Sequence, residues 1–274
     1  MRVNRHRQLP LGETLKAAFA KLPLAWRGAW GAILVCAVVW SVAGWSANAV
    51  EASWAMIGRG VGQIAGLAAG LALAGGLTRI AVSADLDEAR RRGLGPAGLQ
   101  FGWPELRLLG AALLCAVFMA MILSVAALLL LALFGMAGLD AEAINQRNWV
   151  AVGPVWKLVL LAVVTLLVAY GVLVMAVRLS LFAPATLGRG HMVSLNSMGV
   201  AQGSFWPLLG GLIVVGLPKL VLIGLSAAGL LSGAARDVVS ALILSGLEAP
   251  LAAVFLGEAY QRLEYWAPDA RDPG

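Results

Sequence analysis

The sequence contains few of the residue types that build reactive sites. Its 274 residues include only two cysteines and two histidines, and only 12% of them are charged. Cys36 and Cys115 both lie in apolar runs, which excludes the disulfide framework of a small secreted domain. His6 and His191 are too few to form a metal cluster of the Cys and His type. We therefore expect no cofactor, no metal site and no enzymatic activity.

Apolar side chains, by contrast, are in large excess. They make up 61% of the residues, and the mean hydropathy is +0.87. One helical crossing of a membrane needs about 20 apolar residues, so the chain has room for six crossings but for no separate soluble domain. The sequence therefore predicts an all-α polytopic membrane protein. Its apolar runs cover 29–50, 60–82, 108–137, 155–178, 207–231 and 238–261.

The first apolar run has two interpretations. It follows a basic segment and ends near Ala47-Asn48-Ala49, which resembles a signal-peptide cleavage site. However, the run is long enough to span a membrane and is flanked by Trp30 and Trp45, which favours its retention as the first crossing. We accordingly divide the chain into an amphipathic cytoplasmic or interfacial segment (1–28), a six-helix transmembrane domain (29–262) and a cytoplasmic tail (263–274).

The positive charges are distributed unevenly between the two sides of this arrangement. Fifteen of the twenty Lys and Arg residues fall on the side of the termini, four fall on the other side, and Lys219 lies within a crossing. Cytoplasmic loops of membrane proteins carry this excess, so both termini are expected in the cytoplasm, at a bacterial-type inner membrane. The net charge of +6 is thus an orientation signal, and nucleic acid is not an expected partner.

A weak threefold pattern runs through the crossings. The third and fifth are introduced by Phe101-Gly-Trp-Pro104 and Phe205-Trp-Pro207, and the even-numbered crossings end at Arg79, Arg178 and Arg262. The pattern favours three helical hairpins, each preceded by a short interfacial amphipathic helix. Alternatively, aromatic and arginine residues only mark the membrane boundaries.

Four short segments carry a resemblance to a known family. They are 178–185 (RLSLFAPA), 194–197 (SLNS), 202–207 (QGSFWP) and 259–263 (AYQRL). The chain resembles bacterial six-helix membrane proteins related to the membrane domain of glycerophosphoryl diester phosphodiesterases and to the YciC-like proteins. The resemblance implies a membrane domain without known chemistry of its own. The soluble barrel that performs hydrolysis in the fused members has no counterpart here.

Glycines recur every four residues in the second crossing, at Gly58, Gly62, Gly66 and Gly70. Such a row, also called a glycine zipper, forms a smooth helix face that another backbone can approach closely. We expect a contact with another helix of the same chain, and a seam between copies of the chain is the alternative. The oligomeric state does not follow from the sequence.

The connector after the second crossing contains three consecutive arginines, Arg90, Arg91 and Arg92. They precede a Gly93-Leu-Gly95-Pro-Ala-Gly98 segment that matches the dinucleotide fingerprint only formally, because no strand precedes it. A flexible turn is the better interpretation of that segment. We expect the arginines to contact anionic lipid headgroups.

Two ionisable residues are predicted deep in the membrane, Lys219 in the fifth crossing and Glu248 in the sixth. Because a lone charge at that depth is costly, we expect them to form an ion pair. Pro218 lies beside Lys219 and Pro250 lies two residues after Glu248, and both prolines free helix carbonyls that need a partner from the protein or from water. The pair would either fix the helix register or line a polar chamber.

These features favour a non-enzymatic membrane protein that acts as a lipid-contacting scaffold or as a partner subunit of another membrane protein. The alternative is a small transporter or channel built around Lys219 and Glu248. A dry, closed ion pair would favour the scaffold. A solvent-connected cavity that reaches both charges would favour transport.

Overall fold

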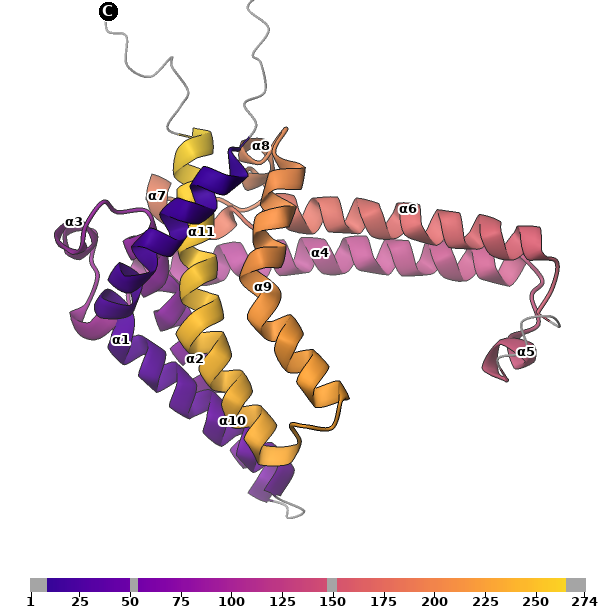
Figure 1. Ribbon diagram of the computed structural model, residues 1–274, viewed down its shortest axis with the longest axis horizontal. Coiled ribbons are helices and arrows are strands. Elements are labelled where there is room, and N and C mark those ends of the chain that lie inside the picture. The colour runs from indigo at the N-terminus through magenta and orange to yellow at the C-terminus, as the bar shows by residue number, and fades with distance from the viewer. Residues whose placement is uncertain (1–8, 50–53, 147–151, 265–274) are drawn as a thin grey trace, which may run out of the picture.

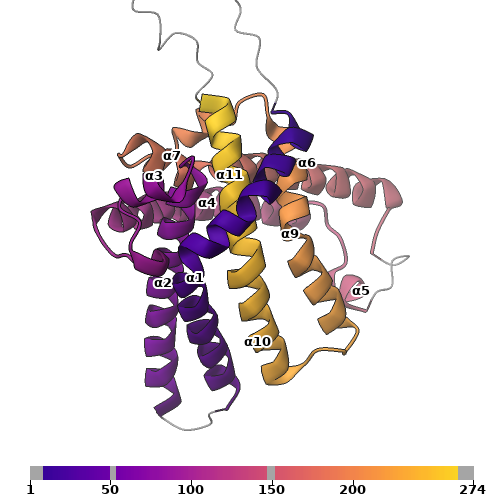
Figure 2. The same ribbon diagram turned by 60° about the vertical axis from the view of Figure 1, so that its left-hand side comes forward.

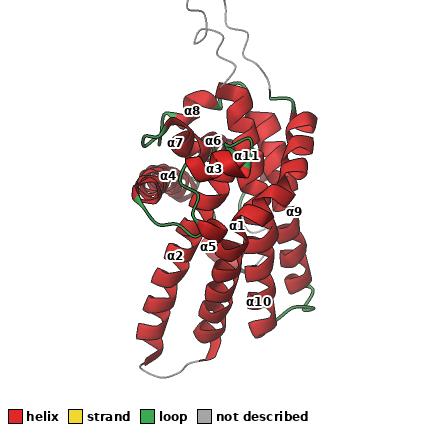
Figure 3. Ribbon diagram, turned by 90° about the vertical axis from the view of Figure 1, so that its left-hand side faces the viewer, coloured by secondary structure: helices red, strands yellow, loops and turns green. Residues whose placement is uncertain are grey.

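The computed structural model describes residues 9–49, 54–146 and 152–264. All regular elements in these ranges are helices, and no strand occurs in them (Figure 3). Six helical segments of the described chain are long and apolar enough to cross a membrane. The prediction of an all-α polytopic protein is therefore confirmed.

The first hairpin consists of α1 (Leu11–Ala49) and α2 (Trp54–Ala81), which lie side by side (Figure 2). The helix α1 contains Pro23 and bends at Ala29, whose φ of −121° is not helical. Consequently the amphipathic lead-in and the first crossing form one bent helix. Two short elements follow this hairpin, α3 (Leu86–Arg91) and η1 (Pro96–Gly98).

The second and third hairpins are joined by two short helices. The second hairpin comprises α4 (Trp103–Met136), the short α5 (Ala141–Asn145) and α6 (Val155–Leu179). The connection contains α7 (Phe182–Arg189) and α8 (Ser197–Val200). The third hairpin pairs α9 (Phe205–Ala227) with a long composite helix made of α10 (Gly233–Ile243), the π-helical turn η2 (Leu244–Glu248) and α11 (Ala249–Glu264).

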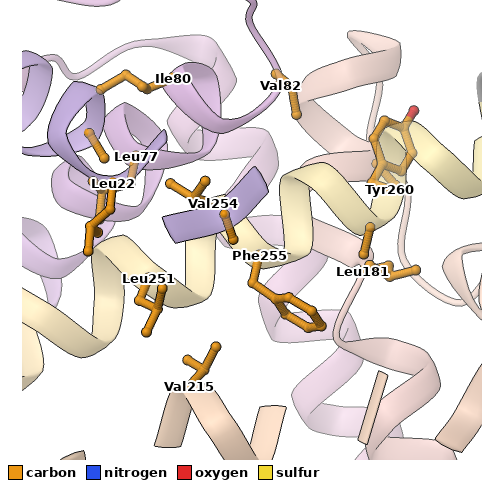
Figure 4. Close-up of a cluster of buried hydrophobic side chains, with 14 of the residues drawn as sticks. Leu22, Leu77, Ile80, Val82, Leu181, Val215, Leu251, Val254, Phe255 and Tyr260 are labelled. Carbon is orange, nitrogen blue, oxygen red and sulfur yellow. The ribbon is translucent and has the colours of Figure 1, made fainter. Parts of the chain in front are cut away.

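The core of the molecule surrounds α11. Val254, Phe255 and Tyr260 of this helix are almost completely buried and point toward different neighbours (Figure 4). Gly257 allows α2 to approach closely, because a Cβ atom there would lie 2.6 Å from the Cβ of Ala81. The core therefore fixes the ends of α1, α2, α7 and α9 around α11.

The hairpin of α4 and α6 runs across the direction of the other long helices. Figure 1 shows it projecting from the rest of the molecule, and Figure 3 looks down the axis of α4 while the other long helices are seen from the side. None of the residues in the most apolar stretch of α4 is buried, and only 6% of those in α6 are. Hydropathy predicts the length of these helices but not which neighbours they pack against, so this arrangement was not foreseen.

Candidate functional site

A cavity lies between the C-terminal half of α9 and the helix formed by α10 and η2. Its volume is about 500 Å³. Its polar lining comes from Lys219, Ser226, Arg236, Ser240 and Glu248, and the remaining lining is apolar. The cavity thus brings together the two membrane-depth charges that the sequence singled out.

Lys219 and Glu248 do not form the predicted ion pair. No ion pair within 4.0 Å joins them among the described side chains. Lys219 is exposed, Glu248 is half-buried, and the Oε2 atom of Glu248 is buried without a hydrogen-bond partner in the described part of the chain. The sequence predicts the depth of the two residues along their helices. It does not predict the rotation about the helix axes, which turns both side chains toward the cavity.

The π-helical turn η2 forms part of the cavity wall and ends at Glu248. Its last hydrogen bond runs from the N–H of Ala249 to the carbonyl of Leu244, which is one residue wider than in an α-helix. Pro250 follows and has no N–H to donate to Gly246. The Nε1 of Trp26 instead donates to the Gly246 carbonyl at 2.7 Å. The freed Gly246 carbonyl therefore has a partner, and of the two sources expected, protein or water, it is the protein that supplies it.

One edge of the cavity is formed by the start of α10, which packs against α1. Arg236 pairs with its neighbour Asp237, with 3.3 Å between Nη2 and Oδ1. The Asp237 side chain lies against Gly44, where a Cβ atom would come within 2.9 Å of the Cβ of Asp237. The start of α10 is therefore held against α1, which leaves the cavity on the opposite side toward α9.

The glycine row of α2 faces α1. A Cβ atom added at Gly66 would lie 3.2 Å from the Trp40 ring, and one at Gly70 would lie 3.3 Å from the same ring. At Gly62 the nearest atom is the Cβ of Ala43, at 3.5 Å. The Nε1 of Trp40 also donates to the Gly66 carbonyl at 3.1 Å. Gly58 belongs to α2, but its surroundings lie outside the described part of the structure.

Several ion pairs near the ends of the helices were not predicted from the sequence. The guanidinium of Arg79 pairs with Glu105, and both are buried. Lys21 of α1 contacts Glu258 of α11 at 3.1 Å and donates to the Ala81 carbonyl at 2.8 Å. The distribution of Lys and Arg along the sequence indicates orientation only, although the arginines at the ends of the even-numbered crossings are a signal that acidic partners lie nearby.

The three consecutive arginines have different surroundings. Arg90 pairs with Asp87 on the exposed surface of α3, and Arg92 pairs with Glu88 at 2.7 Å. Arg91 is exposed. The Ala84 N–H, and then Arg92, lower the pKa of Glu88 below its ordinary value. Only part of this arginine cluster is therefore free to contact a lipid surface.

The described residues contain no group of three His, Cys, Asp or Glu side chains that could hold a metal ion. His191 is exposed, and its Nδ1 lies 3.2 Å from the carbonyl oxygen of Arg189. Comparison of the chain with family models, with curated proteins and with solved structures found no match. The resemblance to the YciC-like proteins therefore stays a prediction, and function must be inferred from the geometry of this chain.

Proposed function

We propose that this chain is a non-enzymatic integral protein of a bacterial-type inner membrane, with both termini in the cytoplasm. It acts as a lipid-contacting scaffold or as a partner subunit of another membrane protein. The observation that carries this proposal is the uncovered apolar surface of the α4 and α6 hairpin. The resemblance to the YciC-like family would agree with such a role, since it implies no chemistry.

The hairpin presents apolar side chains around most of its circumference. Leu131 of α4 is 70% exposed and Leu166 of α6 is 69% exposed. Contiguous apolar surfaces of this extent are rare on water-soluble monomers and mark contacts with lipid or with other proteins. A hairpin that has few contacts with its own protein is suited to holding lipid or a second membrane protein. Arg91, exposed in the last turn of α3, offers a further contact with anionic headgroups.

The surroundings of the hairpin can be measured with spin labels. Leu131→Cys and Leu166→Cys are labelled in a chain without Cys36 and Cys115 and reconstituted in vesicles of phosphatidylethanolamine and phosphatidylglycerol. Contact with lipid gives high accessibility to oxygen and low accessibility to a water-soluble nickel complex. Leu73→Cys on α2 is the control, because Leu73 is buried and should be shielded from both. High accessibility of the hairpin to the nickel complex would contradict the proposal.

The cavity favours a second candidate function, a small transporter or channel. Lys219 and Glu248 line a shared cavity of about 500 Å³ instead of closing on each other. Pro218 lies beside Lys219, and the π-helical turn that ends at Glu248 provides irregular backbone, which membrane proteins tolerate where it lines a cavity. Such a cavity could hold a polar substrate part of the way across the membrane.

Water access to the cavity distinguishes the two candidates. Ser240→Cys places a thiol on the cavity wall, and Ser245→Cys places one on the same composite helix at a buried position outside the cavity. Transport requires rapid reaction of the first thiol with a membrane-impermeant reagent while the second stays unreactive. Equal protection of both thiols would favour the scaffold.

A further inference from the structure

A smaller cavity lies where the end of α2, the start of α4 and the end of α7 meet. Its volume is about 200 Å³, and three arginine side chains, Arg79, Arg92 and Arg107, contribute to its lining. These residues come from three separate segments of the chain, and neither Arg90 nor Arg91 lines the cavity. We call it the three-arginine cavity.

The three guanidinium groups are held in place by hydrogen bonds to the surrounding protein. The Nε of Arg79 donates to the Arg92 carbonyl at 3.1 Å, and its Nη1 donates to Glu105. Arg92 donates through Nε and Nη2 to Oε1 of Glu88. Arg107 donates through Nη1 to the Gly190 carbonyl at 2.6 Å. The cavity lining is therefore largely preorganised.

The charges around this cavity do not cancel. Glu105 neutralises Arg79, and Glu88 neutralises Arg92. Arg107 has no carboxylate partner among the described residues, and the described hydrogen bonds use only one of its N–H donors. A guanidinium carries five donors in a planar fork, so most of those of Arg107 are available to a ligand.

We propose that the three-arginine cavity binds the phosphate group of an anionic ligand, with Arg107 as its principal contact. Arginine forks match the geometry of phosphate oxygens, and a net positive charge favours an anion over a neutral molecule. The cavity volume of about 200 Å³ is sufficient for a phosphate group. This inference is independent of the scaffold and transporter proposals.

The position of the cavity indicates two sources for such a phosphate. Arg79 lies in the last turn of α2, at the end of a candidate membrane span. Phosphate groups of lipids lie at the level of such boundaries, and positive side chains there attract anionic lipids. A phospholipid and a soluble phosphate share the same recognition chemistry at this cavity, so experiment must separate them.

The test uses the full chain in detergent and two matched variants. Arg107→Gln removes the uncompensated charge, while Arg90→Gln removes one positive charge from the exposed surface outside the cavity. Native mass spectrometry measures binding of added phosphatidylglycerol and of phosphatidylcholine, and titration calorimetry measures binding of inorganic phosphate. Loss of a charged hydrogen-bonding partner is expected to weaken binding about tenfold or more in Arg107→Gln. Arg90→Gln should bind like the unmodified chain.

Each outcome has a definite meaning. A selective loss of phosphatidylglycerol in Arg107→Gln supports the site with a lipid as its source, and a selective loss of inorganic phosphate supports it with a soluble ligand. Equal binding by the two variants, or no binding by the unmodified chain, would overturn the proposal. Arg107→Lys keeps the charge and serves as a folding control, with binding intermediate between the two extremes.

Discussion

Arg79 in the last turn of α2 binds Glu105 in the first turn of α4, and the two side chains are only 4% and 1% exposed. Arg262, in the last turn of α11, pairs with Glu13 in the first turn of α1, at matching positions along the helices but at the surface, since the Glu13 side chain is 76% exposed. Glu13 and Glu105 are each the third residue of their helix. The end of the first hairpin is therefore linked to the start of the second, and the end of the third hairpin is linked in the same way to the start of the first.

The remaining hairpin departs from this pattern. Arg178 is in the last turn of α6, but the third residue of α9 is Pro207, and the Nε of Arg178 is buried without a hydrogen-bond partner among the described residues. The shared geometry of the other two pairs supports an internal repeat more strongly than aromatic boundary residues do. Boundary residues recur in any membrane protein, whereas a specific pairing between helix ends does not follow from membrane insertion.

The first prediction is that Arg79→Met strongly destabilises the protein. This variant leaves the carboxylate of Glu105 buried without its counter-charge, and breaking a buried pair in this way costs about 3–5 kcal/mol. The free energy of unfolding in detergent provides the measurement. Combining Arg79→Met with Glu105→Gln should recover much of the loss, because neither partner is then charged. A double variant as unstable as the single one would show that packing, not charge, sets the cost.

The second prediction concerns the close contact between α1 and α2. Gly66→Leu should lower the thermal stability of the monomer, because its side chain would displace the Trp40 ring that lies 3.2 Å from the position of a Cβ. Gly60→Leu on the same helix is the control, since no atom lies within 4 Å of a Cβ there. If Gly66→Leu leaves the monomer intact and abolishes only an oligomer, the glycine row contacts a second copy instead.

The sequence predicted features that depend on position along one helix. The number of long apolar helices follows from hydropathy, and the need of the Gly246 carbonyl for another donor follows from the missing N–H of Pro250. The depth of Lys219 and Glu248 was sufficient to place them at one cavity. Each of these inferences needs only the geometry of a single helix and the thickness of a membrane.

Features that depend on how helices pack could not be predicted. Depth along a helix does not specify which way the side chains of Lys219 and Glu248 face. The ion pair that their similar depth led us to expect does not form. The pairing of Arg79 with Glu105 requires α2, α4 and their connection to meet, and apolar composition gives no information about that. Hydropathy also treats α4 and α6 like the other crossings, although their sides remain almost entirely unpacked.

The third prediction concerns pH and the loop that contains α3. The N–H of Ala84 and the guanidinium of Arg92 lower the pKa of Glu88 relative to the unfolded chain. The carboxylate therefore contributes its full stabilisation above the ordinary glutamate pKa of about 4.3 and loses it as the pH falls through the lowered value. Thermal unfolding of Glu88→Gln and of the unmodified chain should accordingly differ near neutral pH and converge in acid. A difference that does not change with pH would exclude this role of Glu88.

The last prediction is that the connector between α4 and α6 faces the outside of the cell and the loop around α3 faces the cytoplasm. It rests on the excess of Lys and Arg on the side of the termini.

Glu142→Cys and Asp87→Cys are introduced separately into a chain that carries alanine at both native cysteines, which are buried. Both new thiols are at exposed positions, so a failure to react reports topology and not burial. A membrane-impermeant maleimide added to intact cells should label Glu142→Cys, whereas Asp87→Cys should react only after the membrane is permeabilised. The reverse pattern would invert the orientation. Labelling of both thiols in intact cells would mean that the loop around α3 and the connector between α4 and α6 lie on the same side of the membrane. In that case α4 would not cross the membrane as the predicted six crossings require.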